Sequence, residues 1–327
     1  MQRRQILKQL ALLPVALQFP TISFANSKFP DGPIQMIVPF APGGHSSILG
    51  RLFSSRFTEH IKAPVIIMNK PGAGGAVAAE FVARSEPNGQ ILIFHASSSS
   101  IYSALSRRPA PYDPVNSFEN VGLVGIAPFV LAVSEKSPFK SLTELVEYAR
   151  KNPGKLSYGS AGLGSSTNVA GERLKIIGGN LDILHVPYKG AGPAIVDTIG
   201  QMVDCTIDNY ITTLKLHNEK RLRILAVFAD HRSEAAPDIP TAKEQGIDMV
   251  GNTFNLVSAP KGTPKEVVDI LAKALHETMQ EKPLIQGMKD LGMEPVLDST
   301  PESTKKFIAD QVAIIDEVIK KANLYVS

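Results

Sequence analysis

The chain has 327 residues, of which 43% are hydrophobic and 20% are charged, so it holds enough apolar material for about two globular domains. The first 25 residues contain three basic side chains and no acidic one, and the rest balances 31 basic against 31 acidic residues, which gives no indication of a nucleic acid or an anionic membrane as partner. Because Cys205 is the one cysteine of the sequence, an internal disulfide is excluded. The seven histidines lack the spacing of metal ligands, and we expect neither a metal nor a cofactor.

The N-terminus has the layout of an export signal. A basic region with Arg3 and Arg4 precedes an apolar run from Ile6 to Phe19, and small residues follow up to Ala25. We expect residues 1–25 to be a signal peptide, and the paired arginines are similar to a twin-arginine signal. A membrane anchor is the alternative, which the proline and glutamine inside the apolar run disfavour.

Short β-branched runs alternate with helical segments along the rest of the chain. The predicted strands are Ile34 to Val38, Val65 to Met68, Ile91 to Phe94, Phe129 to Val133, Ile183 to Val186, Asp204 to Ile207, Ile224 to Val227 and Asn255 to Ser258. The predicted helices begin near Ser46, Gly75, Ser141, Ser165, Pro193, Thr241, Pro264, Pro283 and Pro301. This alternation predicts an α/β fold with mostly parallel sheets and helices on both faces, in which ligands bind beyond the carboxyl ends of the strands.

Three of these helix starts carry capping signals, one of which is Thr263 before Pro264 at a first helical position. Ser141 is followed three residues later by Glu144, the spacing of a capping box, and Thr300 precedes a proline at a first helical position. These signals locate the helix starts to within a residue or two.

The segment PFAPGG, Pro39 to Gly44, lies between the first predicted strand and a helix. Glycine lets a ligand oxygen approach the backbone, and a helix N-terminus presents unpaired N–H groups with about half a positive charge. We call this segment the first cradle and expect it to bind an anion; a tight turn with a serine cap is the alternative. Its candidate ligand-binding residues are Phe40, Gly43, Gly44, His45, Ser46 and Ser47.

A second glycine-rich segment, GSAGLGSST from Gly159 to Thr167, directly precedes a helix and is called the second cradle. Its amides and hydroxyls can satisfy a carboxylate, each bond to the charged acceptor being worth about 1.5–3 kcal/mol. Its candidate residues are Ser160, Ala161, Gly164, Ser165, Ser166 and Thr167.

Three further candidates lie at the ends of predicted strands. Tyr188 either points its hydroxyl at the ligand or forms a wall of the site. Asp208 either faces the ligand or caps a helix that begins at Ile211. Ser97, in the run Ala96 to Ser100, either contributes a hydroxyl or belongs to a solvated loop.

Several ordered sequence blocks carry a family resemblance. The blocks are PFAPGG, NKPGAGG (69–75), YDP (112–114), NPGKLSYGSAGLGSST (152–167), HVPYKGAGPA (185–194), DN (208–209) and SAPKGTP (258–264). Together they resemble the Bug-type extracytoplasmic solute receptors of tripartite tricarboxylate transporters. The resemblance implies a two-lobed periplasmic-binding-protein fold of the Venus flytrap, type II-like kind, each lobe a mostly parallel sheet flanked by helices, with a small organic acid held in the cleft.

The resemblance also implies an exported, monomeric periplasmic protein that delivers its ligand to membrane permease subunits. Because the family's chain passes twice between the lobes, we expect residues 26–125 plus 252–327 to form lobe one and residues 126–251 to form lobe two. A sensor that reports ligand occupancy to a membrane signalling protein uses the same closure and stays open as an alternative.

Three positions depart from the family pattern. Ser47 stands where aspartate is usual, His45 where a small polar residue is common, and Asn168 where histidine is common. The missing carboxylate removes a like-charge penalty, so we expect a ligand with more negative charge, or without an amino group, compared with relatives that keep the aspartate. That His45 faces solvent is the alternative.

An enzyme is the rival class. A hydrolase built on Ser165, His185 and Asp208 can be drawn, but the chain has no Gly-x-Ser-x-Gly elbow and no Gly-x-x-x-x-Gly-Lys-Ser/Thr nucleotide loop. We therefore predict binding without catalysis.

Overall fold

The structure of the protein is a computed structural model. It describes residues 29–40, 42, 45–188, 190–233 and 236–325, without the side chains of His45 and Ile211. The predicted signal peptide, Gly43, Gly44 and the side chain of His45 therefore lie outside the described residues.

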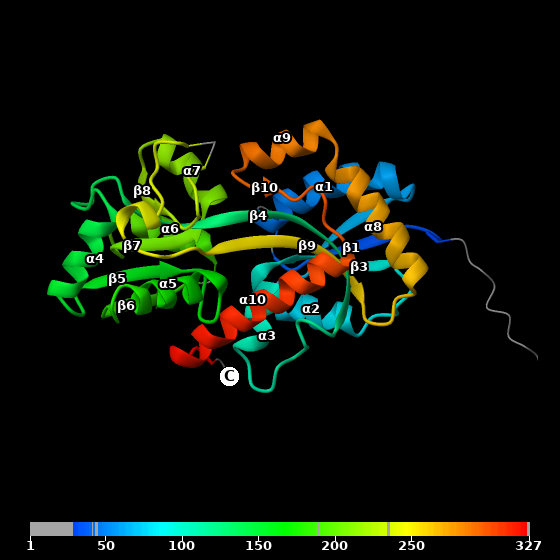
Figure 1. The fold of residues 1–327 in the computed structure, drawn as a ribbon, viewed down its shortest axis with the longest axis horizontal. Coiled ribbons are helices and arrows are strands. Elements are labelled where there is room, and N and C mark those ends of the chain that lie inside the picture. The colour runs from blue at the N-terminus through cyan, green and yellow to red at the C-terminus, as the bar shows by residue number, and fades with distance from the viewer. Residues whose placement is uncertain (1–28, 41, 43–44, 189, 234–235, 326–327) are drawn as a thin grey trace, which may run out of the picture.

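The first lobe is built on three parallel strands in the order β2-β1-β3. The strands are β1 (Ile34–Val38), β2 (Val65–Asn69) and β3 (Ile91–Ala96). Its helices are α1 (His45–Ile61), the short turn η1 (Ala73–Gly75), α2 (Ala76–Ala83), the π-helical turn η2 (Ser98–Tyr102), α3 (Ser103–Leu105), α8 (Lys265–Met279), α9 (Lys282–Asp290) and α10 (Pro301–Lys321). The C-terminal helices thus return to the lobe that the N-terminal part of the chain begins (Figure 1).

The second lobe has its own parallel strands, in the order β7-β5-β6. The strands are β5 (Leu156–Ser160), β6 (Ile183–Pro187) and β7 (Cys205–Asn209). A further strand of this lobe, β8 (Leu222–Val227), pairs antiparallel with the end of β4 (Phe118–Ser134). Its helices are α4 (Leu142–Lys151), α5 (Ser166–Ile177), α6 (Ala191–Ile199), α7 (Tyr210–Asn218) and the turn η3 (Lys243–Gln245).

Two long antiparallel strands join the lobes, as Figure 1 shows. In β4 (Phe118–Ser134), residues 118–128 pair with β9 (Asn252–Pro260), whereas residues 129–134 pair with β7 and β8. The strand β9 also pairs with β3, and the short β10 (Glu294–Pro295) pairs with β4. One continuous strand order, β2-β1-β3-β9-β4-β7-β5-β6, therefore runs through both lobes.

The predicted α/β class and the parallel pairing within each group of three strands are confirmed. The predicted strand at 129–133 is only the end of β4, which is 17 residues long. Its earlier part contains Gly122 and Gly125, which hide a strand pattern; a Cβ on Gly122 would lie 2.8 Å from Leu275 and one on Gly125 2.6 Å from Met288. Those glycines let α8 and α9 pack directly on the strand.

Two of the three predicted caps are confirmed, whereas α8 begins at Lys265 with Pro264, not Thr263, as its N-cap. The Ser141 hydroxyl accepts a hydrogen bond from the Glu144 amide, and Thr300 forms a reciprocal capping box with Ser303. The helix predicted near Thr241 is wrong: the segment forms only η3 and ends at Gly246, whose left-handed backbone stops it.

The lobes have separate hydrophobic cores. The core of the first lobe contains the stacked rings of Phe53 and Phe57, two residues of α1, together with side chains of α8. The core of the second lobe contains Phe129 and Phe228. A third cluster packs α10 on β4 and β9 and takes in Val169 of α5, so apolar contact also crosses between the lobes.

His95 of β3 is a buried histidine in the first lobe. Its ring lies edge-on to Phe118 at 4.9 Å between ring centres, and its Nδ1 lies 3.2 Å from the hydroxyl of Ser99. Burial lowers the pKa of His95 to about 3.

Because the folded protein binds a proton at His95 less readily than the unfolded chain, we expect stability to fall as pH drops from about 6.5 towards 3. The loss from this group amounts to at most about 1.4 kcal/mol per pH unit. The free energy of unfolding, measured with urea at several pH values in this range, should depend less steeply on pH in His95→Gln than in wild type. The exposed control His276→Gln should keep the wild-type pH dependence. Equal slopes in all three proteins would contradict this assignment.

Candidate functional site

The loops at the carboxyl ends of the two groups of parallel strands meet between the lobes. Ser98, in η2 after β3, donates a hydrogen bond to the hydroxyl of Ser166 at the start of α5, with 3.0 Å between the oxygens. This contact joins the serine run of the first lobe to the second cradle. The sequence analysis named only Ser97 from that run; the run itself was the available signal for Ser98.

The described part of the first cradle is tied to the end of β2. The side-chain amide of Asn69 donates to the carbonyl of Phe40 at 2.7 Å, and its nitrogen lies 3.5 Å from the hydroxyl of Ser47. Ser46 and Ser47 are buried in the first turn of α1. Asn69 is therefore a positioning residue of this cradle that the sequence analysis did not single out.

Ser97 is fully buried, so it does not belong to a solvated loop. Its hydroxyl lies 2.9 Å from that of Thr253, the second residue of β9. The bond fixes the start of η2 against the strand that connects the lobes.

The second cradle is organised by its own side chains. Ser165, at the predicted helix start, is the N-cap of α5, a role that the sequence analysis did not assign to it, and its hydroxyl accepts from the amide of Asn168. The amide of Ala161 donates to Thr167 Oγ1 at 2.9 Å, and that of Gly164 donates to Asn168 Oδ1 at 3.0 Å. These two amides are thus engaged within the loop in this structure.

Two amides of the second cradle are left over. Among the described residues, neither the N–H of Ser166 nor that of Thr167 has a hydrogen-bond acceptor. Both belong to the first turn of α5, where the helix dipole favours negative charge. Both amides can therefore bind an anion directly.

Asn168 connects the second cradle to a buried polar network. Its Oδ1 is fixed by the Gly164 amide, so its Nδ2 faces the hydroxyl of Tyr158 at 2.9 Å and Nδ1 of His185 at 3.3 Å. Tyr158 in turn donates to Glu172 at 2.7 Å. Because Asn168 is fully buried, its amide holds three groups in place at once.

This network sets the tautomer of His185. Since Asn168 donates to Nδ1, the ring proton lies on Nε2, which donates to the hydroxyl of Ser160 at 2.7 Å. Burial is the main cause that lowers the pKa of His185, which favours this neutral form. The Ser160 hydroxyl also accepts from the Gly162 amide, so it links the backbone of the second cradle to His185.

Asp208 is a buried carboxylate at the end of β7. It accepts from the amide of Asn209 and from the hydroxyl of Thr212, both at 2.7 Å. Burial raises the pKa of Asp208 to about 6. The N-cap of α7 is Asn209, so Asp208 is not the capping residue that the alternative reading proposed.

Tyr188 follows β6 and is partly buried. Its hydroxyl donates to the carboxylate of Asp197 in α6 at 2.7 Å. The hydroxyl is thus held within the second lobe.

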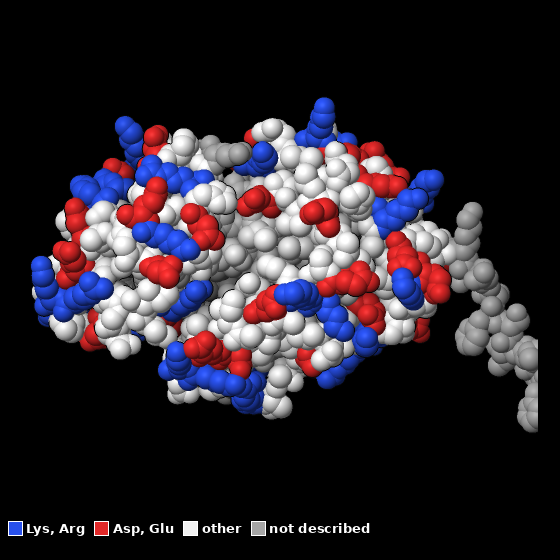
Figure 2. All heavy atoms as spheres, viewed as in Figure 1, with Lys and Arg blue, Asp and Glu red and all other residues white. Residues whose placement is uncertain are grey.

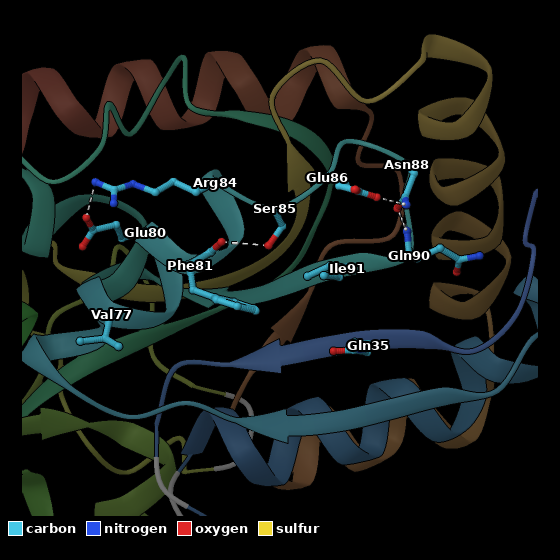
Figure 3. A pocket seen from close by; sticks show the side chains of 10 residues that line it. All are labelled: Gln35, Val77, Glu80, Phe81, Arg84, Ser85, Glu86, Asn88, Gln90 and Ile91. Atoms are coloured by element: carbon cyan, nitrogen blue, oxygen red, sulfur yellow. Dashed lines mark hydrogen bonds and ion pairs between the residues drawn. The ribbon is translucent and has the colours of Figure 1, made fainter. Parts of the chain in front are cut away.

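A cavity of about 720 Å³ lies on the first lobe, away from the two cradles, and is drawn in Figure 3. It is lined by Gln35 near the start of β1, by Ile91 at the start of β3, and by α2 side chains including Phe81. These are the amino ends of the strands, opposite to the end where sheets of this kind bind ligands. We therefore do not assign the ligand site to it.

The face of the molecule drawn in Figure 2 carries no single dominant charge. Figure 2 shows acidic and basic side chains interspersed over both lobes. In the described part of the chain, no group of three or more His, Cys, Asp or Glu side chains is placed to hold a metal ion. None of the described helices is long and apolar enough to cross a bilayer.

Two α/β lobes joined by paired strands, with glycine- and serine-rich loops meeting between them, define the class of periplasmic binding proteins. The structure of the periplasmic binding protein BugD is similar to this one, with a TM-score of 0.81, 32% sequence identity, and coverage of 91% of this chain and 99% of that chain. The profile of the tripartite tricarboxylate transporter family receptors matches residues 49–324. The chain belongs to this family.

Other members of the family are similar over nearly the whole chain. Protein BugT of Bordetella pertussis is 33% identical over 286 residues, which cover 87% of each chain. The structure of R. palustris Rpa4515 with adipate has a TM-score of 0.83 and 29% identity, and covers 91% of this chain and 99% of that one.

Replacing Asn168 by alanine should destabilise the protein by about 2–4 kcal/mol, because the buried Gly164 amide loses its acceptor and His185 and Tyr158 lose a donor. Denaturant unfolding measures the loss. The matched control Asn152→Ala removes an amide at the end of α4 that bonds only the Tyr148 carbonyl, and it should cost less than about 1 kcal/mol. Equal losses would show that the network carries no special weight.

Asp208→Asn should stabilise the protein above pH 6. The folded state penalises the ionised carboxylate, so stability is lost as pH rises from about 4 to about 6, and asparagine removes a penalty of about 3 kcal/mol. The new amide can donate to Thr212, whose own proton turns to the Asn209 carbonyl 2.9 Å away. Unfolding at pH 8 and pH 4 tests this: the gain should appear at pH 8 and vanish at pH 4, and a loss at pH 8 would contradict it.

Proposed function

We propose that this protein is a periplasmic receptor that binds a small organic acid between its lobes and delivers it to the permease subunits of a tripartite transporter. The observation that carries the proposal is the pair of free amides at Ser166 and Thr167, at the N-terminus of a helix that faces the other lobe through Ser98. The family membership and the adipate bound to a relative support the same class of ligand.

We propose that the first cradle supplies the opposite wall, through the backbone of residues 40–44 and the hydroxyls of Ser46 and Ser47. Since serine replaces an acidic residue there, a dianionic ligand meets no repulsion from position 47. Asp208, whose protonated form is favoured by burial, then serves as a donor or acceptor to the polar end of the ligand.

We further propose that residues 26–125 with 252–327 move as one lobe and residues 126–251 as the other. The change of partners within β4 at residues 128 and 129, from β9 to β7 and β8, supports a hinge at that point. The lobes of such a receptor close when the ligand contacts both of them.

Binding without turnover is part of the proposal. Ser165 bonds the Asn168 amide, His185 bonds Ser160, and Asp208 bonds Asn209 and Thr212, so the three residues of a hydrolase triad do not bond one another. The neighbouring Ser160 and His185 do bond, but the proton on Nε2 leaves His185 unable to accept the serine proton.

Adipate at 100 times its Kd should raise the stability of the mature protein by about 2.7 kcal/mol, measured as a ligand-dependent Tm, with no product formed from an activated ester. Ser166→Pro should weaken binding about 10- to 100-fold, because it removes one amide donor while proline remains compatible with the first helical position. Isothermal titration measures the affinity.

Two controls separate the amide from the side chain. Ser166→Ala keeps the amide and removes only the hydroxyl that accepts from Ser98, so its affinity should stay within about threefold of wild type. Ser55→Ala changes an exposed serine on α1 and should have no effect. Unchanged affinity in a folded Ser166→Pro protein would remove the amide pair from the site, and hydrolysis of the ester would contradict the receptor function.

A further inference from the structure

A second cavity, of about 170 Å³, lies where the chain passes between the lobes. Its walls come from α5 in the second lobe, from α10 in the first, and from the connecting segments at Phe129 and at residues 249–252. Figure 1 shows α10 running along β9 towards α5. The volume equals that of about five or six liquid water molecules, at about 30 Å³ each.

Four polar side chains line this hinge cavity, Tyr102, Arg173, Asn252 and Gln311, and three of them carry the argument. Arg173 of α5 donates from Nη1 to the Val250 carbonyl at 2.5 Å, and it has no carboxylate within ion-pair distance among the described residues. Tyr102 is only 6% exposed, and its hydroxyl makes no hydrogen bond within the described chain. Asn252 holds a buried Oδ1 that lacks a described partner.

The cavity combines these groups with apolar walls. Val169, Met249, Ile315 and Val318 are buried along it, while Ile314 at its rim is exposed. The Glu317 carboxylate interacts with Arg173 electrostatically, but among the described residues it forms no salt bridge with it, so the planar fork of the guanidinium can still bind a carboxylate. Tyr102 is a second donor to such a group, and the buried oxygen of Asn252 requires a donor from the occupant.

We infer that the hinge cavity is a binding site for a short-chain hydroxycarboxylate, separate from the cleft at the cradles. The carboxylate of the ligand bonds Arg173 and Tyr102, its hydroxyl donates to Asn252, and its few carbon atoms lie against Val169 and Val318. The ligand class follows from the combination of one cation, one hydroxyl donor and one buried acceptor without a described partner around a cavity of about 170 Å³.

The position of the cavity gives its occupant an effect on closure. Because α5 and α10 belong to different lobes, a change in the angle between the lobes changes the cavity, and a ligand there favours one angle. By linkage, the occupant of the hinge cavity and the ligand of the cleft must alter each other's affinity by the same factor.

The probe is 3-hydroxybutyrate, titrated into the mature protein by isothermal calorimetry, with butyrate and 1,3-butanediol as truncated analogues. We expect binding of 3-hydroxybutyrate, weaker binding of butyrate because Asn252 stays unsatisfied, and none of the uncharged diol. Tyr102→Phe should lower the affinity several-fold and Arg173→Gln at least tenfold. The matched controls Tyr148→Phe and Arg84→Gln alter an exposed tyrosine and an exposed arginine and should leave it unchanged.

The same variants identify the site. If the probe occupies the cleft instead, Ser166→Pro weakens it while Tyr102→Phe and Arg173→Gln do not, and the inference is overturned. No binding at about 20 mM probe also overturns it, since that leaves less than about 3 kcal/mol of affinity. Tyr102→Phe removes a hydroxyl that bonds nothing described, so its Tm should equal that of wild type and its lost affinity cannot come from unfolding.

Discussion

The pairing of β4 with β9 is the constraint on which the rest of the structure depends. These two strands carry the chain between the lobes, and their antiparallel ladder fixes how the strand ends of one lobe face those of the other. Both the cradles and the hinge cavity are defined by this ladder: the cradles lie at the loops it brings together, and the cavity lies against the points where it enters the second lobe. A shift of register would displace both.

The second cradle illustrates how a neutral site is held rigid. Three loop amides are satisfied by Ser160, Thr167 and Asn168, whereas the first-turn amides of Ser166 and Thr167 have no acceptor among the described residues. The loop is therefore preorganised around its own side chains before any ligand arrives, which lowers the ordering cost of binding. Asn168 does this without charge, whereas a histidine at the same place would add a titrating group beside His185.

Much of the architecture was predictable from local patterns, because strand alternation and capping residues act over a few positions. Ser141 and Thr300 cap helices where the sequence indicated. The strand β5 was missed because its sequence, LSYGS, has Tyr158 as its one β-branched or aromatic side chain, and it is stabilised by neighbouring strands on both sides.

The site was predictable as a set of loops but not as a set of bonds. The glycine and serine content identified both cradles, yet it did not distinguish the engaged amides of Ala161 and Gly164 from the free ones of Ser166 and Thr167. Those bonds depend on side chains whose partners lie on other elements, as Asn69 does for Phe40. The role of Asp208 likewise follows from its burial, which no local pattern encodes.

The contact between Ser98 and Ser166 also bears on how fast the lobes separate. A bond between two neutral hydroxyls contributes about 0.5–1.5 kcal/mol net, and water can replace it as the gap widens. An ion pair at the same place would make opening depend on ionic strength. A hydrogen bond between two hydroxyls instead keeps the exchange between the closed and open forms rapid and insensitive to salt.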